Sequence, residues 1–257
     1  MTEQSAIYPS LKDRPVLVSG GASGIGAAIV TEFANQGAKV GFVDLDADAG
    51  EALAERLGGE GARHKPVFRA LDLRHLDALA ATVAELENAL GGIGALVNNA
   101  ANDERHALED ITPEYWRDRM AVNLDHLVFM AKAAVPGLER AGRGAIVNMG
   151  SCSWRMGLAN LTAYVTAKAA IEGLTNGLAR ELGPKGIRVN CVIPGSINTQ
   201  RQIDKWLTPE YKKVIMDGQC LKEFIEPEYV ARMVAFLSSD DSRMCSSGTY
   251  TVDAGWI

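Results

Sequence analysis

Short apolar runs rich in valine and isoleucine alternate along the chain with longer segments in which apolar side chains recur at helical spacing. The first run, Val16-Leu17-Val18, is apolar throughout, and Ile25, Ile29 and Phe33 then lie on one face of a helix. The same alternation predicts strands at residues 16–18, 39–44, 67–71, 95–98, 145–149, 187–193 and 249–252. It predicts further helices at residues 48–57, 76–90, 112–139, 163–182 and 227–237.

The strands are apolar on both faces, which is typical of a parallel sheet covered by helices on both sides. Seven strands alternating with helices predict an α/β, Rossmann-like, doubly wound fold. No linker, repeat or low-complexity tract divides the chain, so we expect one domain over residues 1–257. Residues 196–218 interrupt the alternation, and an irregular stretch of that length predicts a lid or substrate loop.

Composition narrows the possible functions of this fold. The chain has 257 residues, 47% of them hydrophobic and 23% charged, with a net charge of −6. An acidic balance without a basic cluster argues against nucleic acid as a partner, and no apolar run has the roughly 18 residues of a membrane span. Residues 1–4 do not begin a signal peptide, so we expect a cytoplasmic protein.

Cysteine and histidine spacing adds no further chemistry. Cys152, Cys191, Cys220 and Cys245 form no Cys-x-x-Cys pair, which predicts reduced and mostly buried thiols. The four histidines are equally scattered, so we expect no metal site.

A glycine-rich loop directly follows the first strand and leads into a helix. Gly20 permits the sharp turn, Gly24 leaves room for a pyrophosphate, and Gly26 allows the helix to approach the sheet closely. Amide groups at the positive end of the helix dipole then meet the phosphate charge. The candidate cofactor contacts in this loop are Gly20, Ser23, Gly24, Ile25 and Gly26.

Asp44 ends the second predicted strand, 24 residues after Gly20. A carboxylate there can bind both ribose hydroxyls of adenosine and repels a 2′-phosphate, so we expect NAD rather than NADP. The alternative is an aspartate that only caps the following helix.

Tyr164 and Lys168 lie four residues apart on a predicted helix and therefore share one face. A phenol titrates near pH ~10, and a neighbouring ammonium is expected to lower that pKa until Tyr164 can serve as a general acid and base. Ser151, at the end of a strand, could orient the reacting oxygen.

Together these residues resemble the short-chain dehydrogenase/reductase family over almost the whole chain. The matching stretches are residues 19–26, 72–73, 98–101, 121–124, 151, 164–168 and 194–195, together with Thr199. The resemblance implies a catalytic tetrad of Asn123, Ser151, Tyr164 and Lys168. Tyr164 and Lys168 would also contact the cofactor, with Lys168 holding the nicotinamide ribose. It implies further cofactor contacts from Asp72, Leu73, Asn99, Ala100, Pro194, Gly195, Ile197 and Thr199. It also implies a homotetramer, with helices 112–139 and 163–182 in a four-helix contact.

Finer matches resemble a narrower group, the bacterial NAD-dependent aldose 1-dehydrogenases, and among them the D-xylose enzymes. These matches include residues 98–106, Ser153-Trp154, residues 205–210 and residues 252–256. A sugar needs polar side chains around its ring and an apolar face against its C–H surface. The candidate substrate contacts are Asn102, Glu104, Arg105, Ser151, Trp154, Asn160, Tyr164, Asn198 and Trp206.

The expected reaction is oxidation of an aldose at C1 to the aldonolactone. L-Arabinose, D-galactose and L-fucose are alternative substrates, because one hydroxyl configuration separates such sugars. A 3-oxoacyl or ketone reductase could use the same tetrad, and an NAD(H)-sensing regulator could use the same glycine loop. For residues 102–106 the plainer interpretation is a solvated turn, and for Trp154 and Trp206 it is packing in the core or at a subunit contact.

Overall fold

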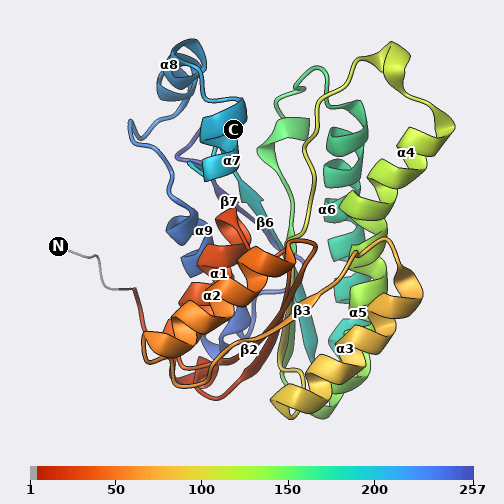
Figure 1. Cartoon of the computed structure of the whole chain (residues 1–257), viewed down its shortest axis with the longest axis vertical. Helices are drawn as coiled ribbons and strands as arrows, with labels where there is room; N and C mark the ends of the chain where they lie inside the picture. The colour runs from red at the N-terminus through yellow and green to blue at the C-terminus, as the bar shows by residue number, and fades with distance from the viewer. Residues whose placement is uncertain (1–4) are drawn as a thin grey trace.

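Seven parallel strands pair in the order β3-β2-β1-β4-β5-β6-β7 in the computed structural model, which describes residues 5–257 (Figure 1). The strands are β1 (Pro15–Ser19), β2 (Lys39–Asp44), β3 (Val67–Ala70), β4 (Ala95–Asn98), β5 (Gly144–Met149), β6 (Ile187–Pro194) and β7 (Thr249–Val252). The strand order reverses between β1 and β4, and in doubly wound sheets ligands bind outside the carboxyl ends of the strands at such a point. The predicted fold class is confirmed.

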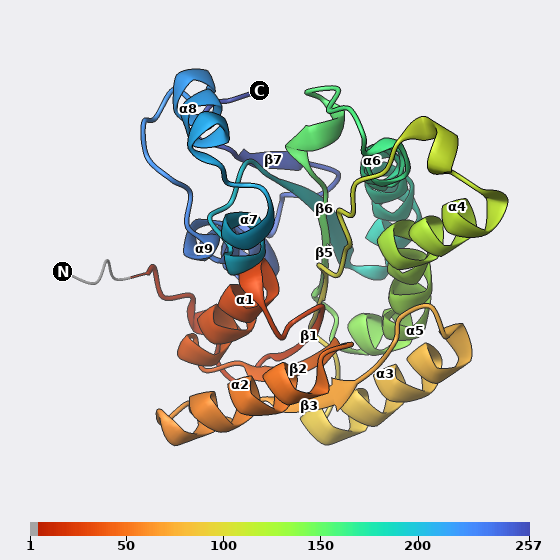
Figure 2. The ribbon, with the colours of Figure 1, turned by 45° about the horizontal axis from the view of Figure 1, so that its top comes forward.

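Helices cover both faces of the sheet (Figure 2). One face packs against α1 (Gly24–Asn35), α2 (Ala47–Gly59) and α9 (Pro227–Ser238). The other packs against α3 (Leu76–Leu90), α5 (His126–Arg140) and α6 (Thr162–Leu182). Each layer is apolar because β1, β4, β5 and β6 send buried valine, leucine and isoleucine side chains to both sides.

The segment predicted as one helix over residues 112–139 is continuous but not regular. It consists of α4 (Pro113–Met120), a π-helical turn (Ala121–Asp125) and α5. Thr112 begins α4, because its hydroxyl accepts a hydrogen bond from the Tyr115 amide at 3.1 Å. The π turn places one extra residue beside the predicted catalytic Asn123.

The prediction of an irregular stretch at residues 196–218 is wrong. The segment holds two short helices, α7 (Gln200–Lys205) and α8 (Pro209–Gly218) (Figure 2). The hydroxyl of Thr199 accepts from the Gln202 amide, and that of Thr208 accepts from the Tyr211 amide. These caps and Pro209 at the first helical position start the helices. Each helix is too short for its apolar period to stand out in the sequence.

Among residues 5–257, none of the helices combines the length and the apolar character that a membrane span requires. Residues 1–4, where the sequence predicts no signal peptide, lie outside the described part of the chain. All four cysteines are free, but only Cys152 and Cys191 are buried, so the expectation of mostly buried thiols holds for half of them. In the same described range, no group of three or more histidine, cysteine or acidic side chains could hold a metal ion.

Candidate active site

Polar groups meet where β1 and β4 end side by side. Ser19 and Asn98 are partners in the parallel register of these strands. The Ser19 hydroxyl accepts hydrogen bonds from the backbone amides of Asn99 and Ala100 at 3.0 and 3.2 Å. The side-chain amide of Asn99 donates two hydrogen bonds, to the carbonyl oxygens of Ser19 and Gly20 at 3.1 and 2.7 Å. Asn99, predicted as a cofactor contact, therefore also holds the glycine loop in place.

At two positions of the glycine loop, Gly20 and Gly26, neighbouring backbone atoms leave no room for a side chain. Gly20 has a φ of 65°, and a Cβ there would lie 2.7 Å from the Ala100 Cα. A Cβ on Gly26 would lie 1.7 Å from the Gly20 carbonyl oxygen. The close approach of α1 to the loop thus requires glycine at residue 26, as the sequence predicts.

A cavity of about 480 Å³ lies outside the loop, at the carboxyl ends of β1, β2 and β4. Its lining includes the predicted cofactor residues Gly20, Ser23, Gly24, Ile25, Gly26, Asp44, Asp72, Leu73, Asn99, Ala100, Tyr164 and Thr199. A cavity that begins at glycines and a helix N-terminus, with both polar and apolar side chains in its lining, fits a dinucleotide.

Asp44 is half-buried at one end of this cavity. Its carboxylate accepts hydrogen bonds from the Ala22 amide at 2.9 Å and the Asp46 amide at 3.2 Å. Asp46, and not Asp44, caps α2 through the Ala49 amide. The alternative interpretation of Asp44 as the helix cap is therefore wrong, and its carboxylate is held at the cavity by the glycine loop.

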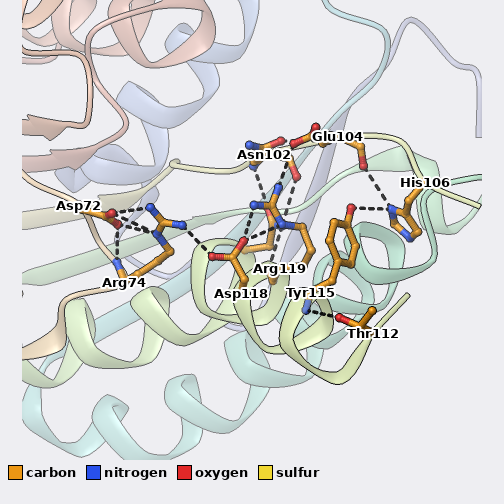
Figure 3. A network of polar contacts seen from close by, with 10 residues as sticks. Asp72, Arg74, Asn102, Glu104, His106, Thr112, Tyr115, Asp118 and Arg119 are labelled. Atoms are coloured by element: carbon orange, nitrogen blue, oxygen red, sulfur yellow. Dashed lines mark hydrogen bonds and ion pairs between the residues drawn. The ribbon is translucent and has the colours of Figure 1, made fainter. Parts of the chain in front are cut away.

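Asp72 takes part in a chain of ion pairs that the sequence does not predict (Figure 3). Arg74 bonds Asp72 at 2.6 Å and Asp118 on α4 at 2.7 Å, and Arg119 joins Asp118 to Glu104. Hydrogen bonds from Arg74 lower the pKa of Asp72 to about 2. Arg74 also lines the larger cavity, so a guanidinium lies there together with Asp72 and Leu73, the predicted cofactor contacts.

A second cavity of about 190 Å³ adjoins the first, and Ser151, Tyr164 and Lys168 line it. The Lys168 ammonium is 5.5 Å from the centre of the Tyr164 ring, and it donates a hydrogen bond to the Met149 carbonyl oxygen at 2.8 Å. The predicted cofactor residues Pro194, Gly195, Ile197 and Thr199 line the same cavity. Three members of the predicted tetrad thus line the smaller cavity, and Tyr164 lines the larger one as well.

The expected effect of Lys168 on its neighbour is not what the structure shows. Burial raises the pKa of Tyr164 above its ordinary value, and a hydrogen bond with Ser151 opposes this increase only in part. Burial also lowers the pKa of Lys168, to about 8. The expected net lowering of the pKa of Tyr164 is therefore wrong for this arrangement, because desolvation of the phenolate outweighs its stabilisation by the ammonium.

Asn123, the fourth member of the predicted tetrad, is held by neighbouring backbone groups. It is fully buried in the π turn and lines neither cavity. Its side chain accepts from the Asn102 amide at 2.8 Å and donates to the carbonyl oxygens of Asn102 and Arg119 at 3.2 and 3.0 Å. Its side chain therefore positions the segment after β4.

The structure brings together only some of the predicted substrate residues. Arg105, Ser151 and Tyr164 line the smaller cavity, and Asn102 lines the larger one. Five others line neither cavity and make other contacts. Glu104 pairs with Arg119, and the Trp206 ring lies against the Arg105 guanidinium. Hydrogen bonds join Trp154 to Glu172, Asn160 to the His106 amide and Asn198 to Glu226. Trp154 donates to Glu172 at 2.9 Å, which matches its plainer interpretation as a packing residue.

Several lining residues of the smaller cavity are not among the candidate substrate contacts predicted from the sequence. Asp103 and Gln202 contribute polar groups, while Tyr211 and Trp256 contribute aromatic rings. Tyr211 could have been found if Thr208-Pro209 had been interpreted as a helix start, since the tyrosine then falls in the first turn. Trp256 follows the last strand, and only the folded chain places it near residue 151.

Comparisons with known proteins agree with this geometry. A family model described as enoyl-(acyl carrier protein) reductase matches residues 20–257. The chain is 50% identical over 252 residues to D-xylose 1-dehydrogenase of Caulobacter vibrioides, covering 98% of this chain and 99% of that protein. It is 44% identical over 255 residues to a Rhizobium meliloti protein named "Probable galactose dehydrogenase GalD", covering 99% of each.

A solved structure has the same architecture. A short-chain type dehydrogenase/reductase from Mycobacterium ulcerans superposes with a TM-score of 0.91 at 26% identity, covering 96% of this chain and 90% of the other. The two sequence relatives match this chain over nearly their whole length. The chain belongs to the short-chain dehydrogenase/reductase family.

Proposed function

We propose that this protein is an NAD-dependent aldose 1-dehydrogenase, which oxidises a D-xylose-like sugar at C1 to the aldonolactone. The observation that carries the proposal is the 50% identity to D-xylose 1-dehydrogenase over 98% of the chain, which includes both cavities. Family alone does not select a substrate, because one fold serves many reactions.

The smaller cavity supports a sugar as substrate. Arg105, Asp103 and Ser151 line it together with the apolar side chains of Met156 and Leu161. A pyranose offers hydroxyl groups at its rim and a C–H surface on its face, so it needs both kinds of wall. An acyl chain would need an apolar slot, and the charged side chains of Asp103 and Arg105 disfavour one.

The catalytic side chains have separate roles in this proposal. Tyr164 takes the proton from the anomeric hydroxyl, and Ser151 orients that oxygen by a hydrogen bond. The ammonium of Lys168 stabilises the phenolate as it forms. A nicotinamide dinucleotide, when bound, supplies the acceptor for the hydride that leaves C1. Asn123 keeps the segment after β4 against the site through its bonds to Asn102.

NAD is the expected cofactor because the Asp44 carboxylate faces the larger cavity. Two backbone amides hold that carboxylate in place, at Ala22 and Asp46. A fixed negative charge accepts bonds from ribose hydroxyls and repels a 2′-phosphate. The residues proposed to hold the dinucleotide are those of the glycine loop together with Asp44, Asp72, Leu73, Asn99, Ala100, Pro194, Gly195, Ile197 and Thr199.

Two further properties stay predictions. A homotetramer would use the outer faces of α5 and α6, where Val128 and two glycines, Gly173 and Gly177, are exposed in the single chain. A cytoplasmic location follows from the sequence expectations alone.

Initial rates on a panel of substrates test the proposal. The panel contains D-xylose, L-arabinose, D-galactose, L-fucose, a simple ketone and a 3-oxoacyl thioester, each with NAD(H) and NADP(H). We expect the highest kcat/KM with an aldose and NAD. Preference for the thioester would replace the proposal with an acyl reductase, and tight NADH binding without any turnover would indicate a sensor.

A further inference from the structure

Asp103 joins two segments that lie about one hundred residues apart, as the sequence separations of 98 and 99 show. One carboxylate oxygen accepts from Arg201 Nε at 2.9 Å, and the other accepts from Gln202 Nε2 at 2.9 Å. Asp103 follows β4, whereas both donors lie in the first turn of α7. Each oxygen of one carboxylate therefore holds a different side chain of α7.

A second contact ties the other end of α7 to the same segment. The Arg105 guanidinium lies 4.3 Å from the centre of the Trp206 ring, directly after α7. A cation over an aromatic face is attracted by the ring's negative charge distribution. Because α7 has only six residues, it is too short to be stable alone, and these contacts decide where it lies.

The contact lies where the two cavities meet. Asp103 and Gln202 line both cavities, as does Tyr164. Arg201 lines only the larger cavity. Any ligand that fills both cavities must therefore pass beside the Asp103 contact.

We propose that Asp103 is a positioning residue that holds α7 closed over the junction of the cofactor and substrate cavities and orients the Gln202 amide toward the sugar. This inference rests on the proposed function. The bond to Asp103 uses one amide hydrogen of Gln202 and so sets the rotation of the amide group, whose carbonyl oxygen is an acceptor suited to a sugar hydroxyl. Arg201 is the ion-pair partner that keeps the carboxylate in place.

The charge of Asp103 also reaches the catalytic residues. It raises the pKa of both Tyr164 and Lys168. The other ionisable groups around this part of the site are Lys168 itself, Cys152, Cys191, His126, Tyr211 and Arg105. Removing the Asp103 charge should therefore lower the pKa of Tyr164, whereas removing Arg201 leaves the carboxylate unneutralised and should raise it.

Three variants separate these effects: Asp103→Asn, Arg201→Met and the matched control Lys205→Met, which removes a cation from the same helix outside this contact. Amide hydrogen exchange over residues 200–205 measures how often α7 opens, and it requires no enzymatic turnover. We expect exchange about fivefold faster in Asp103→Asn and Arg201→Met, as for loss of one exposed ion pair, and wild-type exchange in Lys205→Met. Unchanged exchange in both test variants would overturn the proposal.

Kinetics on the aldose preferred by the wild type give a second readout. We expect both test variants to raise KM about fivefold, and the double variant to be no worse than either single one. The pH midpoint of kcat/KM should fall in Asp103→Asn and rise in Arg201→Met, which a merely structural defect would not produce. If only Asp103→Asn changes KM, the carboxylate binds the sugar directly and the proposal is wrong. If the wild type oxidises no aldose, the proposed function fails, while the exchange data still test the closure of α7.

Discussion

The phenol of Tyr164 is close to Ser151 and Lys168 but is desolvated, so its pKa lies above the ordinary value for tyrosine. A general base acts only when it is unprotonated. As pH rises toward a high pKa, the unprotonated fraction increases about tenfold per pH unit. Lys168, whose pKa is about 8, loses its positive charge as the pH rises past that value. This loss opposes the increase in rate that deprotonation of Tyr164 gives.

The oxidation rate should therefore depend steeply on pH. We expect log kcat/KM for the preferred aldose to rise with a slope of about one between pH ~6 and pH ~7.5, and to flatten above pH ~8 as Lys168 deprotonates. Initial rates in buffers of constant ionic strength measure this. A flat profile below neutrality would show that Tyr164 is not the group that must lose a proton.

Removing only the phenolic hydroxyl tests the role of Tyr164 directly. Tyr164→Phe should reduce kcat by about 10²–10⁴-fold, because proton transfer from the substrate loses its acceptor. NADH binding, followed by fluorescence titration, should change little, since the ring remains in place between the cavities. Turnover close to that of the wild type would remove the basis for the proposed reaction.

Asp44 should set the choice between NAD and NADP. Asp44→Ser removes the fixed negative charge at the end of β2, so we expect the ratio of kcat/KM for NAD over NADP to fall about tenfold or more. The ratio is measured with one sugar and both cofactors. Asp46→Ser, which changes the cap of α2 but keeps Asp44, is the matched control and should leave the ratio unchanged.

At the scale of elements, hydrogen bonds from the residues directly after β4 hold the glycine loop in place before α1. Asn99 bonds two loop carbonyl oxygens, and the Ser19 hydroxyl binds two amides that follow β4. The loop thus keeps its shape through neighbours that lie about eighty residues away, as the separations of 79 to 81 show. Its glycines are required by these close contacts.

Gly26→Ala should destroy the loop geometry. The added Cβ would lie 1.7 Å from the Gly20 carbonyl oxygen, so backbone must move and we expect NADH affinity to fall about 100-fold or more. Gly59→Ala in α2 is the control, since a Cβ there meets nothing within 4 Å. The control should bind NADH like the wild type and unfold at the same or a slightly higher temperature.

The elements also differ in how well the sequence predicts them. Long helices such as α3 and α6 have several turns of apolar period, and their predicted bounds are within a residue or two of the observed ones. The helices α7 and α8 have too few turns for this signal, and only the caps at Thr199 and Thr208 mark their starts. The π turn before α5 leaves the apolar period almost unchanged, so it has no signal at all.

At the scale of the whole molecule, the outer face of α6 offers space that the single chain does not fill. Gly173 and Gly177 are exposed on this helix, and a Cβ at either meets nothing within 4 Å. A surface of this kind allows close approach of another helix, which is consistent with the homotetramer that the family resemblance implies.

Gly177→Trp should therefore break the assembly without unfolding the protomer. We expect analytical ultracentrifugation to give the mass of four chains for the wild type and a smaller species for the variant, with an unchanged far-UV circular dichroism spectrum. The matched control is Gly59→Trp on α2, where a large side chain also has open space. A monomeric wild type would contradict the prediction.

Local patterns in the sequence determine most of the fold and part of the candidate active site. The alternation of apolar periods sets the seven strands and their parallel pairing, the glycine spacing sets the loop, and the four-residue spacing of Tyr164 and Lys168 places both on one face of α6. The tertiary structure alone decides that Asp103 meets Arg201, that Trp154 binds Glu172 away from the cavities, and that burial raises the pKa of Tyr164. The reason is physical: period and spacing act within a few turns of chain, whereas ion pairing across a cleft and desolvation depend on which distant segments pack together.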